Sequence, residues 1–111
     1  MGTSRDDVRS FAEDVRRVIG VALRVAQEGG KSHAAKPLRG FGGATVLEVV
    51  DDFDGDTYRA VYTVRFADAV YVLHAFQKKS RRGRETPKHE LDLVRHRLGM
   101  AADVHRQRIQ G

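Results

Sequence analysis

The sequence predicts an α+β fold, in which N-terminal helices pack on a small antiparallel sheet and a C-terminal helix follows. Residues 4–26 repeat apolar side chains at helical spacing, and residues 57–66 and 69–77 are rich in the Val, Tyr, Phe and Thr that favour strands. After Thr86-Pro87 the apolar spacing is helical again. With 111 residues and 41% apolar content, we expect residues 1–111 to form one domain with a modest core.

The first helix is predicted from an apolar stripe with i, i+3 and i+4 spacing. Ser4 is placed to cap its start, two aspartates follow near the positive end of the helix dipole, and Gly29-Gly30 is expected to end it. A break near Phe11–Ala12 would divide the segment into a helical hairpin, an alternative that the sequence leaves open. The stripe consists of Val8, Phe11, Ala12, Val15, Val18, Ile19, Ala22, Leu23 and Ala26.

The middle of the chain is predicted to be a loop over residues 31–43 and a strand over Ala44–Asp51. A solvated hairpin turn is expected within Asp51–Asp56, where Gly55 can supply a positive φ. The aspartates of this turn also suggest calcium, but the spacing and the distal Glu of an EF-hand loop are missing.

Segments Thr57–Phe66 and Ala69–Gln77 are predicted to pair as an antiparallel hairpin with Ala67 and Asp68 in its turn. That turn implies the pairs Arg65/Val70, Val64/Tyr71, Thr63/Val72, Tyr62/Leu73, Val61/His74, Ala60/Ala75 and Arg59/Phe76. The expected core face carries Tyr58, Ala60, Tyr62, Val64, Tyr71, Leu73 and Ala75. The other face, expected to be open or concave, carries Arg59, Arg65 and His74 among Val61, Thr63, Val70, Val72 and Phe76.

The last helix is predicted to start at Thr86-Pro87, with Thr as cap and Pro at the first helical position. Its apolar stripe includes Leu91, Val94 and Leu98. The sequence leaves open whether Gly99 ends this helix or whether it continues toward Gly111.

The charge pattern indicates a polyanionic partner. Formal net charge is +5, and the segment from Lys78 to Lys88 alone holds six Lys or Arg and one Glu. A compact basic patch of this kind is the electrostatic signature of nucleic-acid binding, and a solvated loop is the alternative. The chain has no cysteine, no apolar run long enough to span a membrane and no signal-like N-terminal segment, so we expect a cytoplasmic protein.

The motifs around this hairpin resemble the HigB-like, phage-derived branch of the RelE/ParE toxin superfamily. That branch has a strand with YR-apolar-apolar-Y, a strand ending in L-H-x-F-x-K-K, then T-P and an amphipathic helix. Here these motifs are Tyr58–Tyr62, Leu73–Lys79, Thr86-Pro87 and Glu90–Leu98. The resemblance implies a RelE-like fold and a type II toxin that cuts messenger RNA on the ribosome and is neutralised by a cognate helix-turn-helix antitoxin.

Metal-free RNA cleavage needs a base for the 2′-hydroxyl, an acid for the leaving 5′-oxygen and cations for the phosphate. From the resemblance, Arg59 is expected to stabilise the transition state, Lys78 and Lys79 to position RNA with one of them in proton transfer, and His74 to serve as acid or base. The RNA-binding set is Arg65, Arg81, Arg82, Arg84 and Lys88. No metal and no other cofactor is expected.

Several alternatives stay open at this point. His74 fits a packed strand histidine as well as a catalytic group, and Arg59 fits a salt bridge to an Asp of residues 51–56. A gyrase-inhibiting toxin of the ParE type, or a noncatalytic basic protein that only binds nucleic acid, are the other functions compatible with the sequence.

Overall fold

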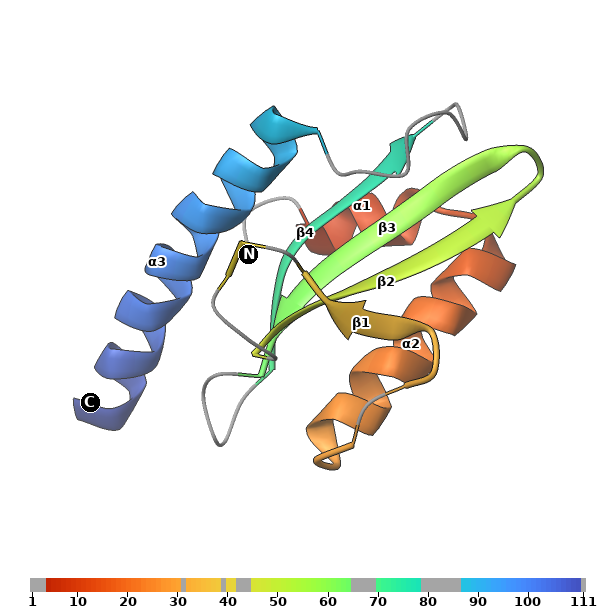
Figure 1. Ribbon diagram of the computed structural model, residues 1–111. Helices are drawn as coiled ribbons and strands as arrows, with labels where there is room; N and C mark the ends of the chain where they lie inside the picture. Colours follow the sequence, from red (N-terminus) through yellow and green to blue (C-terminus); the bar gives the residue numbers. More distant parts are fainter. Residues whose placement is uncertain are drawn as a thin grey trace.

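The computed structural model describes residues 4–30, 32–38, 40–41, 45–64, 70–78 and 87–110, which form three layers (Figure 1). Helices α1 and α2 lie on one face of a four-stranded antiparallel sheet, and α3 lies on the other. The sheet order is β1-β2-β3-β4, so neighbours in sequence are neighbours in space. This architecture confirms the predicted α+β fold. The elements are α1 Ser4–Ser10, α2 Glu13–Gln27, β1 Ala35–Pro37, β2 Val46–Phe53, β3 Asp56–Thr63, β4 Tyr71–Lys78 and α3 Lys88–Gln110.

The N-terminal apolar stripe is divided between two helices at Phe11–Ala12. Ala12 has an extended backbone, with φ −57° and ψ 150°, so α2 starts anew at Glu13. At the other end of α2, Gly29 has a φ of 89°. The Gly29 N–H donates to the Ala26 carbonyl at 3.0 Å and the Gly30 N–H donates to the Val25 carbonyl at 2.9 Å. These two bonds form a Schellman motif, so the glycines end the helix as the sequence predicts.

The turn between β2 and β3 consists of Asp54 and Gly55, with φ values of 52° and 86°. Two successive positive φ values between the paired residues Phe53 and Asp56 are typical of a type I′ hairpin. The predicted turn is therefore confirmed. The strand itself, β2, starts and ends two residues later than predicted, and Ala35–Pro37 pair with it as β1, where only a loop was expected.

The pairing of β3 with β4 confirms one half of the predicted hairpin and contradicts the other. Arg59 lies opposite Phe76, Ala60 opposite Ala75 and Val61 opposite His74, as predicted. Beyond this point the register shifts, and Tyr62 lies opposite Val72 and Thr63 opposite Tyr71. Leu73 is thus the extra residue of a β-bulge. The predicted pairs Tyr62/Leu73, Thr63/Val72 and Val64/Tyr71 are wrong. Arg65, the predicted partner of Val70, and the turn Ala67–Asp68 lie outside the described residues.

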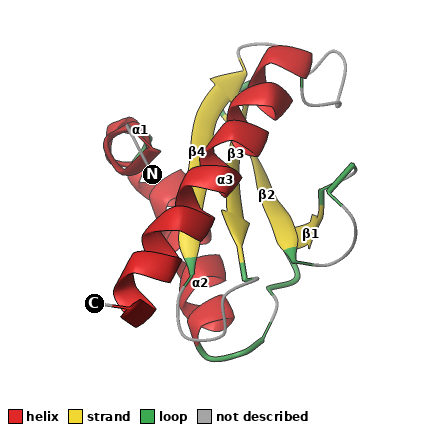
Figure 2. Cartoon of the chain, turned by 90° about the vertical axis from the view of Figure 1, so that its left-hand side faces the viewer, coloured by secondary structure: helices red, strands yellow, loops and turns green. Residues whose placement is uncertain are grey.

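The bulge changes which residues share a face. Tyr58, Ala60, Tyr62 and Ala75 are buried against α1 and α2, as predicted. Leu73 is buried on the opposite face with Val61 and Val94 of α3, and Tyr71 packs there too. The expectation that this second face is open was therefore wrong, because α3 covers it with a second core. Figure 2 shows α3 crossing in front of β4 and β3, with α2 behind the strands.

Helix α3 continues through Gly99 to Gln110. Its C-terminal half is held by packing, since Ala101 is fully buried in the second core and the His105 ring meets the Tyr71 ring edge-to-face at 6.2 Å. Among the described helices, none combines the length and apolar composition that a membrane span requires.

Candidate functional site

Arg59 lies on β3, on the face that α3 covers, and only 4% of the residue is exposed. Its Nη1 is 3.2 Å from Oε2 of Glu48, which is also buried, on β2. The register explains this contact, because Glu48 lies opposite Val61, two residues from Arg59 on the same face. The salt bridge considered as an alternative for Arg59 is therefore present, but its partner is Glu48 and not an aspartate of residues 51–56.

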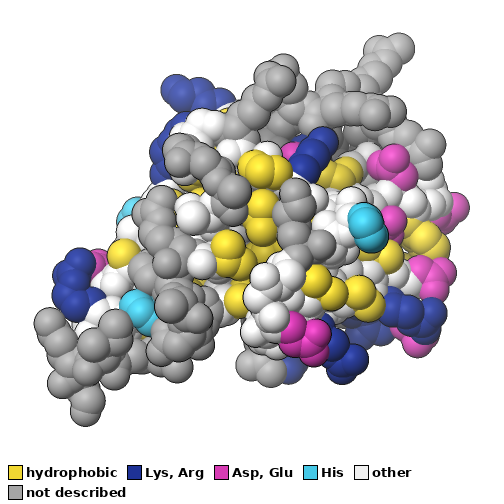
Figure 3. All heavy atoms as spheres, turned by 60° about the horizontal axis from the view of Figure 1, so that its bottom comes forward, with side chains coloured by type: hydrophobic (Ala, Val, Ile, Leu, Met, Phe, Trp, Pro, Cys, Tyr) yellow, Lys and Arg dark blue, Asp and Glu magenta, His cyan; other side chains and the backbone are white. Residues whose placement is uncertain are grey.

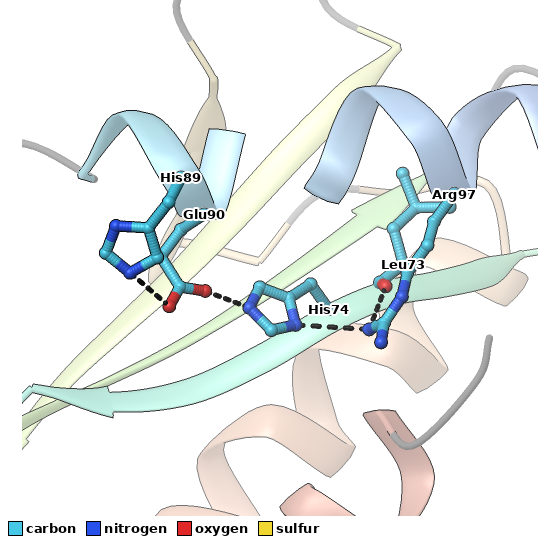
Figure 4. Close-up of polar contacts among 5 residues, drawn as sticks. All are labelled: Leu73, His74, His89, Glu90 and Arg97. Atoms are coloured by element: carbon cyan, nitrogen blue, oxygen red, sulfur yellow. Dashed lines mark hydrogen bonds and ion pairs between the residues drawn. The ribbon is translucent and has the colours of Figure 1, made fainter. Parts of the chain in front are cut away.

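His74 lies on β4, on the same face as Arg59, and is 7% exposed. Its ring stacks on Phe76, with centroids 5.1 Å apart and an interplanar angle of 23°. Its Nε2 bonds to the Glu90 carboxylate, and its Nδ1 is 3.2 Å from Nη1 of Arg97 (Figure 4). The same Arg97 nitrogen donates to the Leu73 carbonyl at 3.0 Å. Two charged residues of α3 thus hold a histidine of the sheet from both sides.

These contacts fit one tautomer of His74. A guanidinium can only donate and a carboxylate can only accept, so Nδ1 accepts from Arg97 and Nε2–H donates to Glu90. In this tautomer both ring nitrogens are engaged within the protein, which fixes the orientation of the ring.

Glu90 connects this buried histidine to the surface. Its second oxygen, Oε1, is 3.1 Å from Nε2 of His89. The exposed fraction of the side chain rises along the row, from 9% at His74 to 18% at Glu90 and 79% at His89. Figure 4 shows the three side chains in sequence, with Glu90 between the two rings.

The structure brings together some of the residues that the sequence singled out. Arg59 lies opposite Phe76, whose ring stacks on His74, so two of the four candidate catalytic residues, Arg59 and His74, occupy neighbouring strands of one face. Lys78 ends β4, and its backbone lies opposite Thr57. Lys88 is exposed at the start of α3. The other basic candidates, Lys79, Arg65, Arg81, Arg82 and Arg84, lie outside the described residues.

On the face seen in Figure 3, the described surface is not dominated by charges of one sign. In Figure 3 hydrophobic side chains form a band across the middle of the view, and basic and acidic side chains both lie toward its rim. The basic segment proposed to meet a polyanion belongs mostly to residues 79–86, which are outside the described part of the chain. In the described part, no group of three or more His, Asp or Glu side chains is arranged so that it could hold a metal ion.

From the sequence, no role in the site was assigned to Glu48, Glu90 or Arg97. Glu90 and Arg97 are seven residues apart, which is two helical turns, so they share one face of α3 and bracket the same partner. Glu48 stands among apolar residues of β2, and a charge in such a strand implies a buried counter-charge. Both signals were present in the sequence, although neither identifies the partner.

Comparison with known families gives one further finding. The family described as phage derived protein Gp49-like (DUF891) matches residues 6–99, a range that includes Glu48, Arg59, His74, Glu90 and Arg97. This family is of the RelE/HigB toxin type and is associated with toxin–antitoxin systems. Comparisons with curated proteins and with solved structures found no match.

Proposed function

Because the chain belongs to the Gp49-like family of phage-derived toxin proteins, we propose that it is a type II toxin that cuts messenger RNA on the ribosome. The observation that carries the choice of chemistry is the row His74–Glu90–His89, in which a buried imidazole, a carboxylate and an exposed imidazole are in contact. Inhibiting an enzyme by binding alone needs no such row, whereas cleaving RNA needs groups that take up and release protons near neutral pH.

In this reaction the 2′-hydroxyl of RNA attacks the adjacent phosphorus and the bond to the 5′-oxygen breaks. We assign Arg59 to the developing charge on the phosphate, Lys78 and Lys79 to positioning the RNA and to proton transfer, and His74 to the acid–base machinery. The remaining cations attract and align the RNA backbone without chemistry of their own. These are Arg65, Arg81, Arg82, Arg84 and Lys88.

The burial of two of these residues refines their roles. Because Glu48 holds the guanidinium of Arg59, RNA phosphate has to compete with a carboxylate for that cation. Because both ring nitrogens of His74 are engaged, His74 acts through its partners on α3 and does not meet RNA directly. The basic segment 78–88 is also a suitable target for an acidic segment of a helix-turn-helix antitoxin, the partner expected in the cytoplasm.

The proposal is tested by inducing the chain alone in a bacterial host. We expect growth and protein synthesis to stop, the 5′ ends of cut messenger RNA to be detected by primer extension, and DNA supercoiling to stay normal. Co-expression of the small helix-turn-helix protein encoded by an adjacent reading frame should restore growth. Arrest with damaged DNA and intact messenger RNA would instead identify a gyrase inhibitor, and harmless overexpression would contradict a toxin.

A further inference from the structure

We infer that His89 is a catalytic residue of this site, the base that takes the proton from the RNA 2′-hydroxyl, and that Glu90, His74 and Arg97 position it. The inference rests on the proposed ribonuclease function. From the sequence His89 is one more exposed histidine of a helix. The structure distinguishes it, because its neighbour Glu90 is held from behind by a buried histidine of the sheet.

His89 is accessible to RNA, whereas His74 is buried. The side chain of His89 is 79% exposed, whereas that of His74 is 9% exposed and stacks against Phe76. A base must come within hydrogen-bond reach of the proton that it takes. Of the two histidines that contact Glu90, only His89 meets this condition.

Glu90 links the two histidines and is itself held in place by His74. Arg97 donates to Nδ1 of His74, Nε2–H of His74 donates to Oε2 of Glu90, and Oε1 of Glu90 faces Nε2 of His89 at 3.1 Å. This contact becomes an ion pair when the His89 ring is protonated, so the Glu90 carboxylate is placed to stabilise an imidazolium at His89. Figure 4 shows the arrangement: the Glu90 carboxylate lies between the rings of His89 and His74. The geometry therefore places a carboxylate, itself held by His74, beside the exposed imidazole that acts as base.

His89 and Glu90 together supply the proton transfer that RNA cleavage needs. The imidazole of His89 takes the 2′-hydroxyl proton while the 2′-oxygen forms its bond to phosphorus. The bond from phosphorus to the 5′-oxygen breaks, that oxygen takes a proton from water, and a 2′,3′-cyclic phosphate remains. The imidazolium formed on His89 is stabilised by the Glu90 carboxylate, the role that a buried carboxylate has behind the base histidine of serine hydrolases. Because His74 and Arg97 fix this carboxylate, little reorganisation is needed when the charge develops.

The test compares single-turnover cleavage of messenger RNA on saturating programmed ribosomes for wild type, His89→Ala, Glu90→Gln and His96→Ala. His96 is the matched control, because it is an exposed histidine two turns further along the same helix. We expect His89→Ala to lose about 10²- to 10⁴-fold in rate, as the loss of a general base does. Ribosome affinity should stay at the wild-type value, and added imidazole should restore part of the rate.

The other variants complete the design. Glu90→Gln should also lower the rate of bound substrate, with unchanged affinity, because a neutral amide does not stabilise the imidazolium. His96→Ala should cleave like wild type. If wild type cleaves and His89→Ala cleaves equally fast, or loses only affinity, the inference is overturned while the proposed function stands. If wild type itself does not cleave, the proposed function fails, and the inference fails with it.

Discussion

The Arg59 guanidinium and the Glu48 carboxylate form an ion pair between β3 and β2, with Nη1 3.2 Å from Oε2 and neither side chain more than 8% exposed. In an ion pair that is removed from water, each charge offsets the desolvation cost of the other, and either charge left alone in the interior would be costly. The pair therefore fastens two central strands directly beneath the candidate site.

Replacing one member of this pair should destabilise the fold. We expect Glu48→Ala to lower the free energy of unfolding by about 3–5 kcal/mol, because the Arg59 charge stays buried without that carboxylate. The control is Arg17→Ala, which removes the exposed pair of Arg17 with Glu13 and should cost less than about 1 kcal/mol. Urea unfolding measures both, and equal small losses would show that burial adds nothing to the Arg59 pair. Activity of Arg59 variants should accordingly be read only after their folding has been checked.

Replacing Tyr62 by Phe should stabilise the fold. Tyr62 is fully buried against α2, burial raises the pKa of its phenol, and among the described residues its hydroxyl has no hydrogen-bond partner. Tyr62→Phe should therefore raise the free energy of unfolding by about 1 kcal/mol, because it removes an unsatisfied polar atom. Thr63→Val is the comparison, since the Thr63 hydroxyl donates to the Thr45 carbonyl at 2.8 Å and its loss should cost about 1 kcal/mol. A loss on Tyr62→Phe would reveal a partner for the hydroxyl.

The pKa of Asp51 is raised above its ordinary value of 3.8, first by burial of the carboxyl and then by the charges of Asp52 and Asp14. An acid with a raised folded pKa binds more protons in the folded state, so its contribution to stability falls as pH rises from the ordinary value through the raised one. We expect Asp51→Asn to be more stable than wild type at pH 7, with the advantage shrinking on acidification toward pH 3.8. Thermal unfolding across this range measures the difference, and Asp54→Asn in the exposed turn is the control. An advantage that does not change with pH would contradict the electrostatic origin.

Ala12, between α1 and α2, has the backbone of a proline. Its φ of −57° and ψ of 150° suit a pyrrolidine ring. Ala12→Pro should raise the free energy of unfolding by about 0.4–1 kcal/mol by restricting the unfolded chain. Arg16→Pro is the contrasting variant, because the Arg16 N–H donates to the Ala12 carbonyl at 2.9 Å inside α2, and its loss should cost about 3 kcal/mol. Destabilisation by Ala12→Pro would mean that the break between the helices depends on the Ala12 N–H or on the conformation of Phe11.

The basic segment should act through charge. Each phosphate contact adds about 0.7–0.9 to the slope of log affinity against log salt, so replacing Arg81, Arg82 and Arg84 by Gln should flatten the slope of ribosome association by about two units. The control replaces Arg16, Arg17 and Arg24 by Gln, which removes the same charge from the exposed side of α2. A salt titration measures both. Equal changes in the two variants would indicate a net-charge effect rather than contacts of this segment.

The sequence predicts the elements whose signals are local. The helix stop at Gly29-Gly30 and the turn at Asp54-Gly55 follow from backbone preferences of those residues, and both are found. The extent of α3 was left open because Gly99 favours an end, and only the burial of Ala101 shows what holds the helix beyond it. The strand β1 was missed because three residues ending in a proline carry no alternation pattern.

The candidate site was predicted less completely, because its partners depend on packing between distant segments. Arg59 and His74 share a face because both lie in the regularly paired part of β3 and β4, on the near side of the register shift at Val61/Tyr62. The position of Glu48 depends on how β2 pairs with β3, and those of Glu90 and Arg97 depend on how α3 covers that face. Both follow from long-range packing rather than from any short motif. The bulge at Leu73 has the same origin, since it lets Tyr71 and Leu73 join the core beneath α3.

The bulge also bears on how this protein behaves at high concentration. β4 is one outer strand of the described sheet, and a strand interrupted by a bulge is a poor template for the strand of a second molecule. The opposite outer strand, β1, is only three residues long, carries an exposed lysine and ends in a proline. Both margins of the sheet thus have features that discourage edge-to-edge aggregation, so crowded copies of the chain should resist growing into fibrils.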